Sequence, residues 1–367
     1  MKLLKPLSFV VVLMGSCLGK EIELPYPTGF YQVGTRAIEL HDRKRKMPGR
    51  GEERRWMVQA FYPCLNNREL RFPYMPGTLS QGKIAGVEVY AHAKPDAGIC
   101  TGKVFPVILF LPGLGQVRQN YTILCETLAS YGYIVLSLDQ PYNSSYVRFL
   151  DGTITMPSLY DGWKVARDRD YRYGYFDTMM TAAIEDCQFM LDHLTEINHH
   201  YFKGHLSVQK IVLMGHSFGG NVAHTLGFKD DRIRAIVDID SKITERKIYG
   251  ILGVPPTPYA TPVLFIRATM QYQEDVGNQL EKIQNARILK FHLEHSAFRD
   301  DAFLVRHIPS IQSVGMLARV WNWFWQKGPQ FDGVDTNLGG RDVNEWFDLW
   351  TQEIIHWLVL NEIGEAS

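Results

Sequence analysis

Seven short apolar runs lie between residues 56 and 291 of the chain, and more polar segments separate them. Runs of this length that are rich in Val, Ile, Leu and Phe are typical of strands buried on both faces of a sheet. From residue 118 onward, the segments between the runs have helical character. This alternation indicates an α/β fold with a mostly parallel central sheet and helices on both faces. We predict strands at residues 56–62, 107–111, 133–138, 210–214, 235–239, 263–266 and 288–291.

The clearest helical pattern covers residues 173 to 197. Apolar residues recur there at intervals of three or four, which places them on one face of a helix. The residues predicted to face the core are Met180, Ile184, Cys187, Leu191 and Leu194. A second amphipathic helix is predicted near residues 343–360.

Length and composition favour one large domain. Apolar residues make up 46% of the chain and supply ample core. A chain of 367 residues can form two domains, but α/β folds often run long as one. We expect residues 20–367 to form a single domain with an aromatic-rich insertion at 140–176 and a Trp-rich helical extension at 310–367.

Aromatic side chains concentrate in the two segments added to this domain. In the extension, Trp321, Trp323 and Trp325 alternate, and we favour burial against the helix near 343–360 over a membrane-interface surface. The aromatic side chains of the insertion either shape a substrate pocket or merely pack the insertion, and we expect packing for most of them. They are Tyr142, Phe149, Tyr160, Trp163, Tyr171, Tyr173, Tyr175 and Phe176.

The most specific chemical signal is the segment Ile211–Gly220, in which an apolar run leads into Gly215-x-Ser217-x-Gly219 and then a potential helix. A serine between strand and helix in this pattern sits on a sharp, strained turn with its hydroxyl exposed above the sheet. The flanking glycines lack the Cβ atoms that would collide where strand and helix pack closely. We therefore predict that Ser217 is a nucleophile.

A serine nucleophile needs a base and an acid that orients the base, and in this architecture they follow in the order acid, then histidine. His295 lies just past the last predicted strand and is the predicted base, whereas His292 is interpreted as a packed strand residue. Asp240, at the end of the strand after Ser217, is the predicted acid. The alternatives are Asp238, one residue pair deeper on that strand, and Glu274 or Asp275 after the following strand.

Acyl transfer also requires N–H donors for the oxyanion. The amide after the nucleophile, that of Phe218, is one candidate. The second should come from the loop after an early central strand, and Pro112-Gly-Leu-Gly115 is such a loop. We predict the Leu114 N–H as the second donor, although an ordinary strand-to-helix turn would also favour Pro and Gly.

These motifs resemble the plasma and intracellular type II platelet-activating factor acetylhydrolases, which have the α/β-hydrolase fold. The likeness covers residues 25–310, and Pro112 stands where the family has His. The resemblance implies a serine esterase that releases short or oxidised acyl groups from phospholipid-like esters through an acyl-enzyme. A broad-specificity esterase, a polyester- or peptide-cleaving relative, and a non-catalytic binding member stay open. The segments that carry it are Pro106–Gly115, Arg118, Tyr121, Ala129–Val135, Gly215–Gly220, Asp240 and His295–Asp300.

The net charge of the chain argues against some classes of partner. The formal net charge is zero, which offers no electrostatic case for nucleic acid or another strongly charged partner. The basic stretch from Arg43 to Arg55 is interpreted as a solvated loop between two strands, with contact to anionic lipid headgroups as the weaker alternative. The expected partner is a lipid-like or small ester, with peripheral contact to a membrane or lipoprotein surface left open.

Residues 1–19 are interpreted as an export or lipoprotein signal. Lys2 and Lys5 precede an apolar core, and small residues follow it. The segment ending in Cys17 resembles a bacterial lipoprotein box, so we expect a secreted or periplasmic protein, with lipid anchoring through Cys17 as an option. No metal-ligand spacing occurs, and we expect no metal or cofactor.

Four cysteines follow the signal. Cys64 and Cys100 fall in predicted loops and could pair in an oxidising compartment. Cys125 and Cys187 fall in helical patterns and are interpreted as buried thiols.

Overall fold

The computed structural model describes most of the chain between residues 21 and 364. The predictions on residues 1–19, Tyr160, Trp163, Glu274, Asp275 and Trp321–Trp325 lie outside the described residues. The described ranges are 21–65, 71–75, 82–84, 86–157, 161, 164–165, 167–241, 260–268, 285–293, 295–308 and 341–364.

The described strands form one large sheet in the order β15-β14-β13-β12-β8-β9-β3-β2-β7. Neighbours from β9 to β15 are parallel, whereas β3 pairs antiparallel with both β9 and β2. Every predicted strand falls within this sheet, apart from a one-residue difference at the start of β9, so the α/β class is confirmed. The bounds are β2 Gln32–Lys46, β3 Glu53–Cys64, β7 Lys94–Pro95, β8 Phe105–Leu111, β9 Ile134–Leu138, β12 Leu206–His216, β13 Ile233–Ile239, β14 Val263–Ala268 and β15 Ala286–Phe291.

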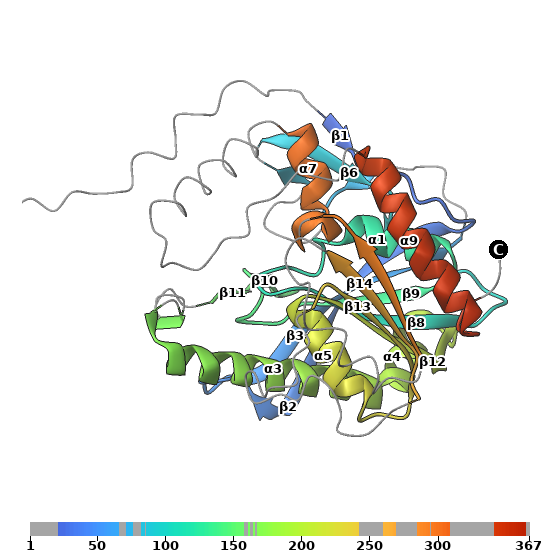
Figure 1. Cartoon of the computed structure of the whole chain (residues 1–367). Coiled ribbons are helices and arrows are strands. Elements are labelled where there is room, and N and C mark those ends of the chain that lie inside the picture. Colours follow the sequence, from blue (N-terminus) through green and yellow to red (C-terminus); the bar gives the residue numbers. More distant parts are fainter. Residues whose placement is uncertain are drawn as a thin grey trace, which may run out of the picture.

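Helices cover both faces of this sheet (Figure 1). On one face pack α1 (Thr122–Ser130), α7 (Asp301–His307) and α9 (Val343–Leu360), together with the short 3₁₀ helix η1 (His295–Phe298). On the other face pack α3 (Arg169–Asp192), α4 (Leu194–Phe202) and α5 (Phe218–Gly227). The two layers therefore enclose the central strands completely.

Strand β8 shows why the central runs are apolar throughout. Its residues alternate between the two faces: Leu109 and Leu111 belong to the cluster under α3 and α5, whereas Ile108 and Phe110 belong to the cluster under α1 and α9. Because both faces are covered, neither set can be polar without leaving an unpaired group in the core.

The segment predicted as one helix over 173–197 belongs to two helices, α3 and α4, because the helix is interrupted at His193. Both the N–H and the ring Nδ1 of His193 bond to the carbonyl oxygen of Phe189, at 3.0 and 2.8 Å. The His193 ring stacks on that of Phe189 at 3.9 Å, and α4 begins at the next residue. No Gly or Pro marks this break in the sequence. The predicted core face is confirmed for its residues except Ile184, which is half-buried.

The interpretation of residues 43–55 as a solvated basic loop is wrong for residues 43–46 and 53–55, which belong to strands β2 and β3. Strands β2 and β3 form a long hairpin, and Arg54 is buried in β3, where its guanidinium donates to Asp186 of α3 at 3.0 and 2.5 Å. Arg45 of β2 also reaches Asp186, at 2.9 Å. These arginines fasten the hairpin to α3 and are not free for a lipid headgroup.

Further short strands flank the main sheet. A small sheet forms from β1 (Glu21–Glu23), β4 (Phe72–Pro73), β5 (Lys83–Ile84) and β6 (Val87–Ala91). In the aromatic-rich insertion, β10 (Val147–Arg148) pairs with β11 (Ile154–Thr155). No helix among the described residues has both the length and the hydropathy of a membrane span.

Insertion aromatics that the structure describes mostly pack inward, as expected. Tyr142 and Phe149 are buried, whereas Tyr173 is exposed. Arg50 lies over the Tyr142 ring at 4.3 Å, and Arg55 lies over the Phe149 ring at 3.9 Å. The hairpin arginines thus cover the insertion from outside through cation–π contacts.

Candidate active site

Ser217 lies at the sharp turn between β12 and α5. Its φ and ψ are 53° and −117°, a conformation that costs a non-glycine residue about 1–3 kcal/mol. Two hydrogen bonds hold the turn: the Ser217 N–H donates to Ile239 O at 2.8 Å, and Asn221 N–H donates to Ser217 O at 3.2 Å. The predicted strained elbow is therefore present.

Close packing around the elbow requires glycine on both sides of the serine. A Cβ atom added to Gly219 would lie 1.9 Å from the carbonyl oxygen of Leu111 at the end of β8. One added to Gly215 would lie 2.3 Å from the Gly219 carbonyl carbon. Both contacts are with backbone, which cannot move aside cheaply, so the helix can approach the strand only without these side chains.

Asp240 and His295 meet in a buried ion-pair geometry. Asp240 comes directly after β13, and its Oδ2 lies 2.6 Å from Nδ1 of His295 in η1. The Ala268 N–H donates to the other carboxylate oxygen at 2.9 Å, which fixes the orientation of the acid. Both side chains are buried. This arrangement directs Nδ1 of the imidazole toward the acid and leaves Nε2 as the nitrogen suited to proton transfer.

The alternative acid Asp238 is fully engaged elsewhere. Its carboxylate accepts two hydrogen bonds from Arg267, at 2.8 and 2.9 Å, and one from Nε2 of His224 at 2.6 Å. Burial alone would raise the pKa of Asp238, but the charges of Arg267 and His224 overcome it and hold the pKa well below its usual range. Ser241 N–H also donates to Asp238 at 3.0 Å, so this carboxylate anchors the turn that carries Asp240.

The interpretation of His292 as a packed strand residue is wrong. Strand β15 ends at Phe291, and His292 is exposed in the bend that follows. His295, three residues further along the chain, contacts the carboxylate of Asp240.

The predicted oxyanion loop follows β8 and lies beside the elbow, with Leu111 O against Gly219. Gly113 N–H donates to Tyr121 Oη at 3.1 Å, and Gly115 N–H donates to Asn143 O at 3.0 Å. Both amides that flank Leu114 are therefore already used, and the Leu114 N–H lies between them.

A hydrogen-bonded path that sequence reasoning missed joins this loop to the His295 segment. Tyr121 Oη, which accepts from Gly113, lies 2.8 Å from Nδ1 of His216. Nε2 of His216 lies 3.1 Å from the carbonyl oxygen of His295. Burial lowers the pKa of His216 well below 6.5, and the neighbouring charges of His295 and Arg299 act in the same direction. The only sequence signal is that His216 occupies the variable position before the serine.

Asp300 is a second residue whose role the sequence did not reveal. Its carboxylate accepts hydrogen bonds from Tyr74 Oη at 2.8 Å and from the N–H groups of Thr122 and Ile123 at 2.7 and 3.1 Å. The last two are orphan donors in the first turn of α1, so Asp300 caps the helix that follows the oxyanion loop. Burial raises the pKa of Asp300 to about 8 despite these donors.

Cys64 and Cys100 lie in adjacent strand-like segments, and both are free thiols in the structure. Cys100 Sγ donates to the carbonyl oxygen of Cys64 at 2.8 Å. Burial raises the pKa of Cys64 to about 11, which leaves its thiol protonated. As predicted, Cys125 and Cys187 are buried.

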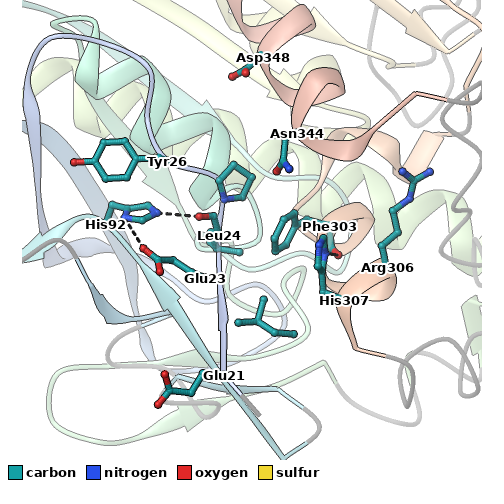
Figure 2. Close-up of a pocket in the computed structure, with 12 residues that line it drawn as sticks. Glu21, Glu23, Leu24, Tyr26, His92, Phe303, Arg306, His307, Asn344 and Asp348 are labelled. Carbon is teal, nitrogen blue, oxygen red and sulfur yellow. Dashed lines mark hydrogen bonds and ion pairs between the residues drawn. The ribbon is translucent and has the colours of Figure 1, made fainter.

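A cavity of about 750 Å³ lies between β1, α7 and α9, and none of the five predicted site residues lines it (Figure 2). His92 projects into it, with Nε2 on Leu24 O at 2.9 Å and Nδ1 at 3.7 Å from Glu23. Glu21, Asp348 and Arg306 add charges of both signs to its lining. The arrangement does not select one ligand chemistry, and it is separate from the elbow. Within the described residues, no group of three or more His, Cys, Asp or Glu side chains could hold a metal ion.

Comparison with known families identifies the fold family of the chain. Residues 106–304 match the family model described as the alpha/beta hydrolase fold. The chain belongs to the α/β-hydrolase family. Residues 18–151 also match the model for platelet-activating factor acetylhydrolase, isoform II, which confirms the resemblance noted from the motifs.

Curated relatives of this chain include a probable 1-alkyl-2-acetylglycerophosphocholine esterase and platelet-activating factor acetylhydrolases. A probable 1-alkyl-2-acetylglycerophosphocholine esterase of Arthroderma benhamiae is 25% identical over 280 residues, covering 67% of this chain and 66% of the relative. Platelet-activating factor acetylhydrolase of Cavia porcellus is 27% identical over 41% of this chain and 38% of the relative. The chain thus spans less than two thirds of the length of these curated relatives.

A solved structure agrees with this assignment. The ferulic acid esterase of Streptomyces cinnamoneus superimposes with a TM-score of 0.64 at 26% identity, covering 78% of this chain and 81% of the esterase.

Proposed function

We propose that this protein is a serine carboxylic-ester hydrolase that works through an acyl-enzyme. The observation that carries the proposal is the 2.6 Å contact between Asp240 and Nδ1 of His295, in a chain whose Ser217 occupies a strained turn between strand and helix. A structural serine turn has no need of a buried carboxylate–imidazole pair nearby. This combination favours catalysis over a binding role.

In the proposed reaction, Ser217 Oγ attacks the ester carbonyl while Nε2 of His295 takes its proton. The Asp240 carboxylate accepts the Nδ1–H hydrogen bond, so it fixes the tautomer of the base and stabilises the imidazolium that forms. The imidazolium then protonates the departing alcohol, and a water molecule repeats the sequence to release the acid. The strained backbone of Ser217 holds its hydroxyl ready for attack.

The negative charge of each tetrahedral intermediate would be held by the N–H groups of Leu114 and Phe218. One such donor contributes about 3 kcal/mol to transition-state stabilisation in a serine hydrolase. The use of the Gly113 and Gly115 amides by Tyr121 and Asn143 supports the choice of Leu114 within this loop.

Short acyl groups on a phospholipid-like ester are the proposed substrates, because the family model over residues 18–151 and the named lipid esterases point in that direction. The proposed reaction requires no cofactor or metal. We further propose export of the protein, on the strength of the charged and apolar pattern of residues 1–19, with Cys17 as an optional lipid attachment site. Partners would then be lipid-like esters, with contact to a membrane or lipoprotein surface.

A feruloyl ester is the second candidate substrate, and the 26% identity with the ferulic acid esterase favours it. The two candidates share the triad chemistry and differ in the acyl group, which is small and aliphatic in one case and bulky and aromatic in the other.

Labelling with a fluorophosphonate probe and a substrate panel test the proposal together. The wild-type protein should be labelled once per chain, and the Ser217→Ala variant should not be labelled. The panel contains nitrophenyl acetate, 1-alkyl-2-acetylglycerophosphocholine, a long-chain phosphatidylcholine and methyl ferulate. Preferential turnover of the acetyl lipid supports the first substrate class, and preferential turnover of methyl ferulate supports the second. An unlabelled wild-type protein would rule out a serine hydrolase.

A further inference from the structure

The imidazole ring of His216 lies directly against that of His295. The ring centroids are 4.4 Å apart, and the planes are inclined by 30°, so the rings stack. His216 is the residue before Ser217, and only 1% of its surface is exposed. Any charge on this ring would therefore act on the neighbouring imidazole across a few ångströms of low-dielectric interior.

The hydrogen-bond partners of His216 select one neutral tautomer. The His295 carbonyl oxygen can only accept, so Nε2 of His216 must carry the hydrogen of the 3.1 Å contact. The Gly113 N–H can only donate, so it occupies a lone pair of Tyr121 Oη. Tyr121 is then free to donate its own hydrogen to Nδ1 of His216 at 2.8 Å. The donors run in one direction from Gly113 through Tyr121 and His216 to His295.

We propose that Tyr121 and His216 are positioning residues for the esterase reaction: they hold the catalytic histidine and the oxyanion loop in one fixed relation and keep the stacked His216 ring neutral. This role rests on the proposed function. The His216 ring supports the His295 backbone through a hydrogen bond and supports its imidazole by stacking. Through Tyr121 the same ring fixes the Gly113 amide, one residue before the proposed oxyanion donor.

The electrostatic consequence follows from the reaction. His295 becomes an imidazolium at each tetrahedral intermediate. A second cation stacked on it would oppose that charge, whereas a neutral ring does not. Because Tyr121 donates to Nδ1, the nitrogen where an additional proton would bind is already occupied by a donor. Packing supports the arrangement, since a Cβ atom on Gly113 would lie 3.1 Å from Nδ1 of His216 and 3.4 Å from Tyr121 Oη.

The decisive variant is Tyr121→Phe, which removes one oxygen atom and keeps the buried ring. It leaves the Gly113 N–H without its acceptor and Nδ1 of His216 without its donor. We expect kcat to fall about 10- to 100-fold, the usual effect of an unmade buried hydrogen bond on a barrier. KM should stay within about twofold, since neither group is expected to bind the substrate. Fluorophosphonate titration should still count one active site per chain.

Tyr62→Phe is the matched control. Tyr62 is also buried, and its Oη donates to the carbonyl oxygen of Ala97 at 2.8 Å, away from the site. The Tyr62→Phe variant loses the same oxygen atom and the same hydroxyl donor as Tyr121→Phe, so it reports the effect of a lost core hydroxyl alone. Its kcat should equal that of the wild type. Equal kcat values for Tyr121→Phe and the wild type would overturn the positioning role.

A double-mutant cycle tests whether the residues act as one unit. His216→Phe keeps a ring to stack on His295 and removes both hydrogen bonds. If Tyr121 acts through His216, the double variant should lose little more activity than His216→Phe alone. Multiplied losses would mean that the two residues act independently and would overturn the proposed path.

Nitrogen-15 NMR of histidine-labelled protein gives a readout that does not depend on activity. His216, assigned through the signals lost in His216→Phe, should show a protonated Nε2 and an unprotonated Nδ1. The opposite tautomer would overturn the proposal even in an active enzyme. A wild-type protein that neither hydrolyses esters nor reacts with the probe would instead reject the proposed function, and the catalytic part of this role with it.

Discussion

Oδ2 of Asp240 lies 2.6 Å from Nδ1 of His295, although 55 residues separate them in the sequence. The two positions follow different parallel strands, β13 and β15, which lie on either side of β14, so both reach the carboxyl edge of the sheet. Asp240 adopts a φ of 50°, so it turns out of the strand instead of continuing it. This turn separates its role from that of Asp238, whose carboxylate is enclosed by Arg267, His224 and Ser241.

Replacing the nucleophile should abolish turnover and leave the fold intact. Ser217→Ala removes the attacking oxygen, and kcat should fall by about 10⁴-fold or more, with a residual rate from the oxyanion donors and substrate binding. Thermal unfolding should change little, because the hydrogen bonds of the elbow use the backbone of Ser217. Steady-state hydrolysis of nitrophenyl acetate measures the loss, and near-normal turnover of a purified variant would contradict the mechanism.

Substitutions of the two aspartates at the end of β13 should have different effects, on activity for Asp240 and on stability for Asp238. Asp240→Asn should lower kcat by about 10⁴-fold, since an amide cannot hold the correct imidazole tautomer. Asp238→Asn should chiefly destabilise the protein, by about 3–5 kcal/mol, because it leaves the buried Arg267 charge uncompensated. Chemical denaturation and kcat are measured for both variants. Asp275→Asn is the mild control, and a loss of activity there comparable to that of Asp240→Asn would indicate that Asp275 is the acid.

The room available for a Cβ atom predicts opposite effects of alanine substitution at two glycines, Gly219 at the elbow and Gly174 in α3. Gly219→Ala places a Cβ atom 1.9 Å from Leu111 O, so it should displace α5 from β8 and reduce both stability and activity. Gly174→Ala, within α3, meets no atom within 4 Å and should stabilise the protein by about 0.5–1 kcal/mol. The unfolding midpoint of each variant decides the comparison. A Gly219→Ala variant with wild-type activity would show that the close approach is unnecessary.

Stability should decline with rising pH because of Asp300. Its pKa is raised from 3.8 to about 8 by burial, so the folded protein retains a proton that the unfolded chain releases. This contribution is complete below pH 3.8 and is lost as the pH rises through about 8. The neutral form is accommodated, because Asp300 can donate to Tyr74 Oη while Tyr74 donates to Gln119 O at 3.3 Å.

Asp300→Asn tests this dependence, since it cannot ionise. Its free energy of unfolding should be lower than that of the wild type at acid pH and should vary less between about pH 4 and pH 8. The titratable groups that interact with Asp300 include Asp301 and three groups whose pKa burial also raises, Tyr74, Tyr121 and Cys125. An unchanged pH slope in the variant would assign the dependence to another buried acid, such as Glu126, whose pKa burial raises to about 7.

The sheet, the elbow at Ser217 and the pairing of Asp240 with His295 could be predicted because each of their residues follows a recognisable local pattern. Apolar runs mark strands that are buried on both faces, and the elbow requires glycines at fixed spacing around Ser217. His295 could be chosen because chain order in this architecture is constrained. The break at His193 could not be predicted, because a side chain that bonds its own backbone replaces the usual Gly or Pro signal.

The contacts that escaped prediction join residues far apart in the sequence. Arg54 and Asp186 are 132 residues apart, and each alone has the pattern of a solvent-exposed charge. Tyr121 and His216 are 95 residues apart, and neither belongs to a motif that assigns it a role. Only packing of the hairpin on α3, or of α1 beside the elbow, reveals such pairs.

The strand order also determines when the site becomes complete during synthesis. Strand β12, which carries the elbow, lies between β8 and β13. A nascent chain can therefore form the Leu111–Gly219 contact before Asp240 and His295 have left the ribosome. A product that stops before residue 295 would lack the proposed base and the Asp240–His295 contact. Under the proposed mechanism, premature termination would thus yield an inert protein.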